Sequence, residues 1–113
     1  MGFMTASHDK SGDELLSADR ISAVAAVLPE WEFGDRVIRR DFSAPTFLDG
    51  IAFVGRIATE AENRDHHPDI DIRWRTVTIA LSTHSAGGLT ELDVALAGAI
   101  DDLFHEMFDA VED

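Results

Sequence analysis

The 113-residue sequence contains no cysteine, which excludes disulfide bonds and thiolate metal sites and is typical of cytosolic proteins. Basic residues are also few: nine lysines and arginines stand against 22 acidic residues, and the formal net charge is −13. A surface this negative repels phosphate groups, so we expect neither nucleic acid nor membrane as a partner. No apolar run approaches the roughly 20 residues of a membrane-spanning helix, and the first residues lack the pattern of a secretion signal. We therefore expect a cytoplasmic location.

Hydrophobic residues make up 45% of the chain, enough for a hydrophobic core, and the length is that of one domain. The first dozen residues are polar and show no periodicity. Residues 1–12 are therefore predicted to form a flexible N-terminal tail, and residues 13–113 a single domain.

Three segments have apolar residues at steps of three and four, which predicts helices. The first begins at the N-cap Ser17 and ends at Pro29, although a capping box from Ser11 to Glu14 would start it earlier. The second follows Pro45, and the third follows Thr90 as its N-cap. The predicted apolar faces are Ile21, Val24, Val27 and Leu28; Phe47, Ile51, Val54, Ala58 and Ala61; and Leu92, Ala95, Leu96, Ala99, Leu103, Met107 and Phe108.

Two segments between the helices alternate apolar and polar residues, as half-buried strands do. The first, up to Phe42, contains the turn dipeptide Gly34-Asp35 and predicts a hairpin; the second runs from Ile70 to Leu81, with a weakly marked break at Arg75-Thr76. The predicted fold class is α+β: a four-stranded antiparallel sheet with three helices packed on one face, in the order α-β-β-α-β-β-α. Trp31 and Trp74 are predicted to belong to the core.

Three histidines lie at predicted element ends, where side chains can project into a cleft. His66 and His67 precede Pro68 where the second helix must end, and His84 follows the last strand. Three interpretations are open. The imidazoles could bond the last helix carbonyls, bind a metal ion together with Glu62 or Asp93, or act as general acids and bases near neutral pH.

A longer pattern around these histidines favours the third interpretation. It combines residue types, spacing and element order, and it extends to Trp31, Arg40, Phe42 and Phe47. This pattern resembles the pterin-4a-carbinolamine dehydratases over roughly Ser17 to the C-terminus. Its central part is Glu62-Asn63-Arg64-Asp65-His66-His67-Pro68, then Trp74, Val77, Ile79, Leu81-Ser82-Thr83-His84, Gly87-Gly88-Leu89-Thr90 and Asp93.

The resemblance implies the dehydration of 4a-hydroxytetrahydropterin to quinonoid dihydropterin and water, with neither a metal nor an organic cofactor. Such a reaction recycles tetrahydrobiopterin, which implies a functional link to an aromatic amino-acid hydroxylase. The family's three catalytic histidines match His66, His67 and His84. The implied substrate-binding residues are Glu62, Asp65, Pro68, Ser82, Thr83, Ser85 and Asp93.

The chemistry suggests separate roles for these residues. Loss of water needs the C4a hydroxyl protonated and the nitrogen deprotonated, so His66 and His84 are expected to transfer protons while His67 holds the ring. Asp93 has two interpretations, as the last residue of a capping box with Thr90 or as a group that orients an imidazole or binds the amino-pyrimidine edge. Where animal relatives carry tryptophan and a tyrosine-asparagine pair, this chain has Ile70 and Trp74-Arg75. Ile70 in place of the tryptophan removes an aromatic surface that could stack on a pterin, so this replacement is expected to affect pterin affinity or preference.

The predicted strands hold more apolar residues than a half-buried sheet needs. Together with the resemblance, this predicts a homodimer or homotetramer, with the dimer favoured. In animals the same fold also serves as a dimerisation cofactor of a transcription factor. A non-catalytic protein-interaction module is therefore the alternative function. The strand residues behind this prediction are Ile38, Phe42, Ile70, Ile72, Val77, Ile79 and Leu81.

Overall fold

A computed structural model describes residues 14–109, and the predicted tail over residues 1–12 lies outside them. The order of elements confirms the predicted α-β-β-α-β-β-α arrangement, with one added 3-10 turn before the last helix. The elements are α2 (Ala18–Val27), β1 (Glu32–Phe33), β2 (Ile38–Ser43), α3 (Phe47–Arg64), β3 (Asp69–Arg73), β4 (Thr76–Leu81), the 3-10 turn η1 (His84–Ala86) and α4 (Glu91–Phe108).

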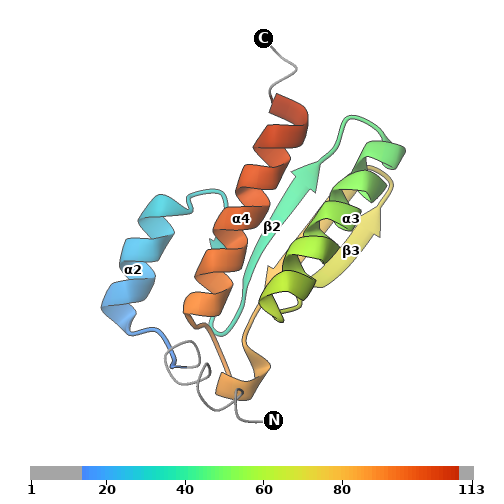
Figure 1. Cartoon of the computed structure of the whole chain (residues 1–113). Helices are drawn as coiled ribbons and strands as arrows, with labels where there is room; N and C mark the ends of the chain where they lie inside the picture. Colours follow the sequence, from blue (N-terminus) through green and yellow to red (C-terminus); the bar gives the residue numbers. More distant parts are fainter. Residues whose placement is uncertain (1–13, 110–113) are drawn as a thin grey trace, which may run out of the picture.

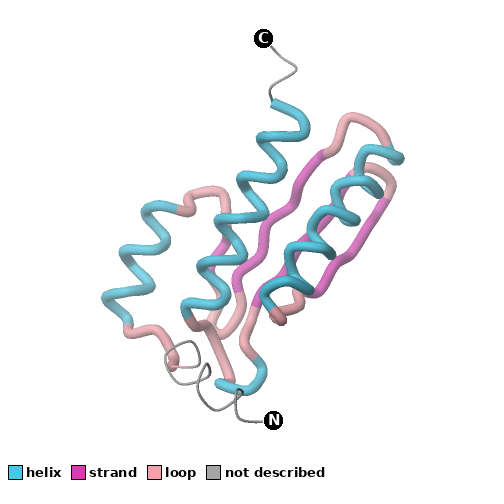
Figure 2. The backbone as a smooth tube through the Cα atoms, in the orientation of Figure 1, coloured by secondary structure: helices cyan, strands magenta, loops and turns pink. Residues whose placement is uncertain are grey.

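The four strands form one antiparallel sheet in the order β1-β2-β4-β3. Residues Ile38 and Leu81 are paired between β2 and β4, and Asp69 and Ala80 between β3 and β4. All three helices lie on one face of this sheet, with α4 between α2 and α3 (Figures 1 and 2). The predicted α+β fold is confirmed, and within residues 14–109 the opposite face of the sheet carries no helix.

Each helix begins at a side chain that accepts a hydrogen bond from the first turn, where backbone N–H groups have no helical partner. The Ser17 hydroxyl accepts from the backbone N–H of Arg20 at 3.1 Å, which confirms Ser17 as the first N-cap. The Thr46 hydroxyl accepts from the backbone N–H of Asp49 at 3.0 Å. Thr90 caps α4 as predicted.

The large apolar side chains of β2, β3 and β4 face the helices, because strand side chains alternate between the two faces of a sheet. Those of β2 and β4 are buried and those of β3 are half-buried. The open face carries polar side chains instead, among them Asp41, whose carboxylate accepts from the Thr78 hydroxyl at 2.7 Å. The sheet therefore has no surplus of apolar residues, and that argument for an oligomer is wrong.

Helix α3 packs through a different face from the predicted one. The buried side is formed by Gly50, Phe53, Ile57 and Ala61, so only Ala61 of the predicted stripe is buried. Both stripes are apolar, and the contacts of Phe53 decide between them: its ring centroid lies 5.1 Å from that of Phe42 and 5.3 Å from that of Phe104.

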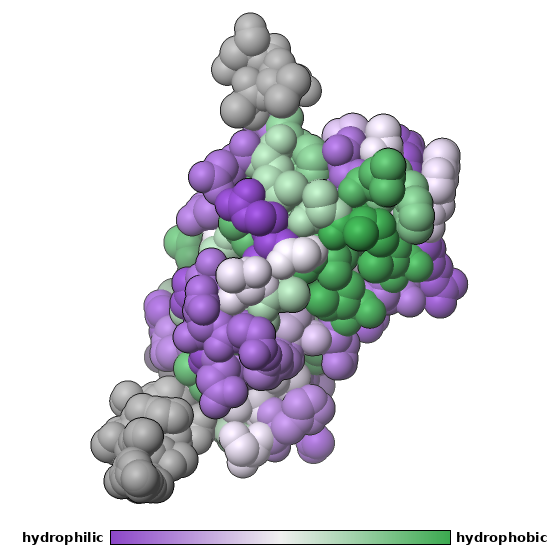
Figure 3. Space-filling model, turned by 45° about the vertical axis from the view of Figure 1, so that its right-hand side comes forward, coloured by the Kyte–Doolittle hydropathy of each residue, from purple (hydrophilic) through white to green (hydrophobic). Residues whose placement is uncertain are grey.

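This rotation leaves three large apolar side chains of α3 exposed, namely Phe47, Leu48 and Ile51, which we call the α3 patch. Leu48 is the most exposed of them, at 75%. Figure 3 shows hydrophobic residues gathered over this part of the molecule. Within residues 14–109, this group of exposed apolar side chains therefore lies on a helix and not on the open face of the sheet.

The break between β3 and β4 lies one residue earlier than predicted, at Trp74-Arg75. Trp74 takes a left-handed backbone conformation with φ 55° and is 72% exposed, so its prediction as a core residue is wrong. A two-residue turn between antiparallel strands often requires positive φ, and here the tertiary pairing imposes it without the usual glycine or asparagine. Arg75 stacks on the Trp74 ring at 4.5 Å.

Trp31 is buried, as predicted, and takes part in a polar contact at the edge of the core. Its indole N–H donates to the Asp101 carboxylate at 2.9 Å, and Arg40 donates to the same oxygen at 2.7 Å. The Arg40 guanidinium also lies 4.2 Å from the centre of the Phe42 ring. This group joins β2, α4 and the segment before β1.

Candidate active site

The end of α3 directs the chain toward the histidines. Asp65 caps the helix in the left-handed conformation, with φ 52°, and the backbone N–H of His66 donates to the Ala61 carbonyl at 3.1 Å. A left-handed cap of this kind reverses the chain within two residues. Asp65 therefore places His66 and His67 on the segment that leads into β3.

His66 is buried, with 8% of its surface exposed, against the fully buried Asp93. Its Nε2 lies 2.6 Å from the Oδ1 of that carboxylate. The other oxygen, Oδ2, accepts from the Thr83 hydroxyl at 2.8 Å and from the backbone N–H of Thr90 at 2.9 Å. Three donors thus bond one buried carboxylate. These bonds offset the cost of burying its charge.

The contacts of Asp93 combine two of its predicted interpretations. It completes the capping box of α4 with Thr90, and it also holds the His66 imidazole. An ionised carboxylate only accepts hydrogen bonds, so Nε2 carries a proton and Nδ1 is the nitrogen that can accept one. The carboxylate thereby fixes both the orientation and the tautomer of the ring.

His67 has a carboxylate partner of its own. Its Nε2 lies 2.6 Å from the Glu62 Oε2, and both side chains are exposed. The two histidines thus contact carboxylates on different elements. The interpretation in which these imidazoles bond the last helix carbonyls is wrong, because the carboxylates take that place.

His84 approaches His67 from the neighbouring strand, because it follows the end of β4 whereas His67 precedes β3. It begins η1, directly after Thr83, whose backbone pairs with Gly88 in an isolated bridge. Gly87 closes this turn at φ 77°, a conformation that favours glycine. The turn holds His84 at the end of β4.

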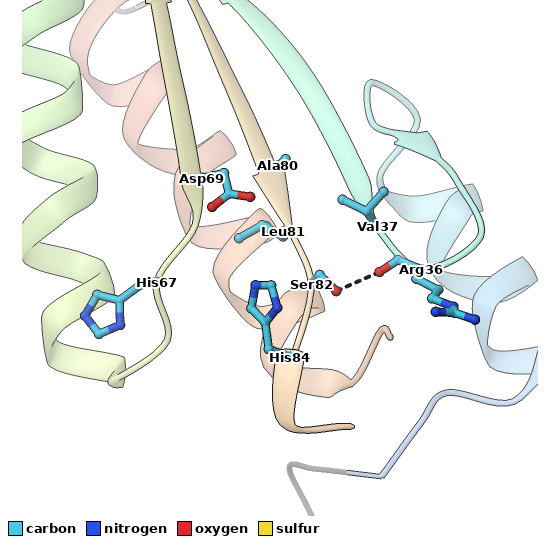
Figure 4. A pocket seen from close by; sticks show the side chains of 8 residues that line it. All are labelled: Arg36, Val37, His67, Asp69, Ala80, Leu81, Ser82 and His84. Atoms are coloured by element: carbon cyan, nitrogen blue, oxygen red, sulfur yellow. Dashed lines mark hydrogen bonds between the residues drawn. The ribbon is translucent and has the colours of Figure 1, made fainter. Parts of the chain in front are cut away.

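His67 and His84 line a common cleft of about 230 Å³ at this end of the open sheet face (Figure 4). Ligand sites usually measure about 300–1,000 Å³, so this cleft is of a size for a small ligand. The Ser82 hydroxyl, also at the cleft, donates to the Arg36 carbonyl at 2.8 Å. The lining residues are Arg36, Val37, His67, Asp69, Ala80, Leu81, Ser82 and His84.

The predicted site residues thus fall into two groups. His67, Ser82 and His84 line the cleft. The others surround it without being among its lining residues: Thr83, His66 and Asp93 are buried, Pro68 is half-buried, and Glu62, Asp65 and Ser85 are exposed.

Sequence reasoning missed Asp69 and Arg36. Asp69 follows the His-His-Pro run directly, but an acidic residue that begins a strand has no distinctive local pattern. Arg36 could be found only from the pairing of β2 with β4, which brings residues 36 and 82 together. Within residues 14–109, no group of three histidine or acidic side chains is arranged to hold a metal ion, and no helix in the same range is long and apolar enough to cross a membrane.

The sequence matches the family model described as pterin 4 alpha carbinolamine dehydratase over residues 14–103. This match covers α2, α3, the sheet, most of α4, and His66, His67 and His84. The chain belongs to this family. The predicted family resemblance is thereby confirmed.

Individual dehydratase relatives agree with this assignment. A Mycolicibacterium smegmatis protein named "Putative pterin-4-alpha-carbinolamine dehydratase" is 53% identical over 92 residues, which are 81% of this chain and 98% of that protein. A Mycobacteroides abscessus protein of the same name is 58% identical and covers 77% of this chain and 93% of its own length. A crystal structure titled transcriptional coactivator/pterin dehydratase from Brucella melitensis superposes with a TM-score of 0.76 at 29% identity. It covers 80% of this chain and 98% of its own.

Proposed function

We propose that the protein dehydrates a 4a-hydroxytetrahydropterin to a quinonoid dihydropterin and water. The observation that carries the proposal is the cleft lined by His67 and His84 in a chain of the dehydratase family. In this reaction the C4a–O bond and the N5–H bond break, a C4a=N5 double bond forms, and water leaves. One group must protonate the departing hydroxyl and another must accept the N5 proton.

His66 and His84 are the proposed proton-transfer residues. The support for His66 is its contact with Asp93, because a carboxylate behind an imidazole stabilises one orientation and one tautomer for proton transfer. The support for His84 is its position in the cleft lining. His67, which lines the same cleft and contacts Glu62, is proposed to orient the pterin ring.

The test is steady-state kinetics of the purified protein with 4a-hydroxytetrahydropterin as substrate. We expect His66→Ala and His84→Ala to lower kcat by about 10²–10⁴-fold, the usual contribution of general acid–base catalysis. His67→Ala should mainly raise KM. His105→Ala is the matched control, since His105 lies on α4 and contacts Asp109. Near-native turnover of either proton-transfer variant would contradict its assigned role, and an inactive wild-type protein would overturn the proposal.

The reaction would serve tetrahydrobiopterin recycling for an aromatic amino-acid hydroxylase in the cytoplasm. Quinonoid dihydropterin is the form that a reductase returns to tetrahydropterin, so the product of this cleft fits such a cycle. The proposal is checked by supplying the protein to a hydroxylase that turns over with limiting tetrahydrobiopterin. Faster removal of the 4a-hydroxy intermediate is expected, and no change would contradict the link.

We also propose that the chain forms a homodimer through the α3 patch. Phe47, Leu48 and Ile51 expose a contiguous apolar surface on one helix, and surfaces of this kind are usually covered in stable proteins. The net charge of −13 opposes association, but at physiological salt the Debye length is only about 8 Å and the opposition is modest.

Sedimentation velocity at micromolar concentration tests this assembly. A dimer is expected for the wild-type protein, and Leu48→Lys should produce the monomer because it places a charge inside the interface. Thr59→Lys, an exposed position further along α3, makes the same charge change and should leave the dimer intact. A wild-type species near 12.4 kDa would refute the dimer.

A protein-interaction module is the second candidate function, favoured by the same exposed patch. The Brucella melitensis structure carries both coactivator and dehydratase in its title, so one fold is associated with both activities. Catalysis separates the candidates: an adaptor would show no turnover with 4a-hydroxytetrahydropterin and no effect of the histidine substitutions.

A further inference from the structure

One carboxylate in the cleft makes no side-chain hydrogen bond or ion pair with the residues that the structure describes. Asp69 is the first residue of β3, is exposed, and lines the cleft with His67 and His84. Figure 4 shows its carboxylate at the wall of the cleft, beside Ala80 on the neighbouring strand, with both imidazoles in the same view. Strand pairing with Ala80 fixes its backbone, and the small alanine side chain leaves space beside it.

Two other carboxylates already contact the histidines, and Asp65, the neighbour of His66, lies outside the cleft lining. Both oxygens of Asp93 accept hydrogen bonds in the protein interior. Glu62 contacts His67, and Asp71 contacts Arg73 at 3.1 Å. Asp69 is the one carboxylate among the residues that line the cleft, and within residues 14–109 its oxygens have no side-chain partner, so they remain available to a ligand there.

A pterin ring offers a matching surface for such a group. At its pyrimidine edge, the N3–H and the 2-amino group are adjacent donors that point the same way. A carboxylate has two parallel acceptor oxygens and can accept both bonds at once, an arrangement that is strong and orientation-specific. C4a belongs to the same six-membered ring, so holding this edge also fixes the position of the reacting carbon.

We propose that Asp69 recognises the amino-pyrimidine edge of the substrate and is the residue that selects pterins over related bicyclic rings. This rests on the proposed function of the cleft. Sequence reasoning considered Asp93 for the same task, but the burial and the hydrogen bonds of Asp93 leave it no oxygen for a ligand. Asp69 supplies the exposed carboxylate that the recognition needs.

Equilibrium binding tests the proposal independently of catalysis. Pterin and lumazine are fluorescent, unreactive probes that differ at position 2, where lumazine has an oxygen in place of the amino group. The wild-type protein should bind pterin at least about tenfold more tightly than lumazine, because the lumazine oxygen would face the carboxylate. Asp69→Asn should bring the two affinities to within about threefold, since its amide both donates and accepts.

Asp71→Asn is the matched control, on the same strand and the same sheet face but outside the cleft lining. It should keep the wild-type preference for pterin. A preference that persists in Asp69→Asn, or equal binding of both probes by the wild-type protein, would overturn the role of Asp69 and leave the dehydratase proposal standing. Absence of pterin binding by the wild-type protein would overturn both.

Discussion

Replacing Asp93 by asparagine should separate its two roles, capping α4 and orienting His66. The backbone N–H of Thr90 can only donate, so the amide oxygen of the new side chain must take the place of Oδ2. The amide NH₂ then faces Nε2 of His66 and donates to it. His66 must move its proton to Nδ1, and the ring is held in the opposite tautomer.

The expected changes in stability and in rate differ greatly in size. The amide oxygen can still accept from Thr90 and Thr83, so the cap survives and only the charge-assisted character of these bonds is lost. We expect the free energy of unfolding to fall by about 1–3 kcal/mol, within the range for a buried hydrogen bond to a charged group. Turnover should fall by about 10²–10⁴-fold, because the nitrogen that should accept a proton is already protonated.

Asp101→Asn is the control for this variant. Asp101 lies on the same helix and accepts hydrogen bonds from Trp31 and Arg40 away from the cleft, so a similar loss of stability should leave kcat nearly unchanged. The measurements are urea unfolding, initial rates across pH, and ¹⁵N NMR of the imidazoles, which reports the tautomer directly. A folded Asp93→Asn protein with wild-type turnover, or with His66 in its original tautomer, would refute the reasoning.

Two further predictions concern metals and pH. Exhaustive chelation should change neither turnover nor Tm, because the proposed chemistry uses imidazoles alone; activity lost to a chelator and restored by a metal ion would contradict this. The Arg20 guanidinium donates to Glu91 at 2.6 Å and holds the pKa of that carboxyl below its usual range. The pair therefore stabilises the fold at neutral pH. This contribution disappears as the pH falls through the Glu91 pKa. Thermal unfolding of Glu91→Gln should thus show a small deficit against the wild-type protein at pH 7 that vanishes in acid and shrinks in salt, and a deficit independent of pH would contradict the assignment.

Local signals in the sequence were sufficient to predict where α2 and α4 begin. Ser17 and Thr90 start their helices because a hydroxyl satisfies an otherwise unpaired N–H, which depends on residues two or three positions away. The alternation of the strands likewise predicted which side chains face the helices. These features needed no knowledge of the tertiary structure.

Features decided by contacts between distant segments were not predictable in the same way. α3 has two adjacent apolar stripes, and only the packing of Phe53 against Phe42 and Phe104 selects the buried one. Trp74 alternates correctly for a core residue, but the register between β3 and β4 places it in the turn. The side chain that hydropathy assigned to the core is therefore exposed.

The cleft likewise combines residues that the local sequence predicted with residues that only contacts between distant segments bring there. The histidines were found because they lie at element ends, where the sequence marks them with proline and glycine. Asp69 was overlooked because an acidic residue beginning a strand has no distinctive local pattern. Its significance arises from the pairing of β3 with β4, which brings it to the same cavity as His84.

Asp93 shows why local and distant signals can both be correct for one residue. The capping box requires a side chain three residues after Thr90 that accepts from the Thr90 backbone N–H, and the sequence displays that spacing. The contact with His66 joins residues 27 positions apart, and it forms because the cap directs the carboxylate toward the end of α3. The hydrogen bond that begins α4 thus also aims the group that orients His66. A substitution that preserved the cap but not the charge would keep the fold and lose the proposed chemistry.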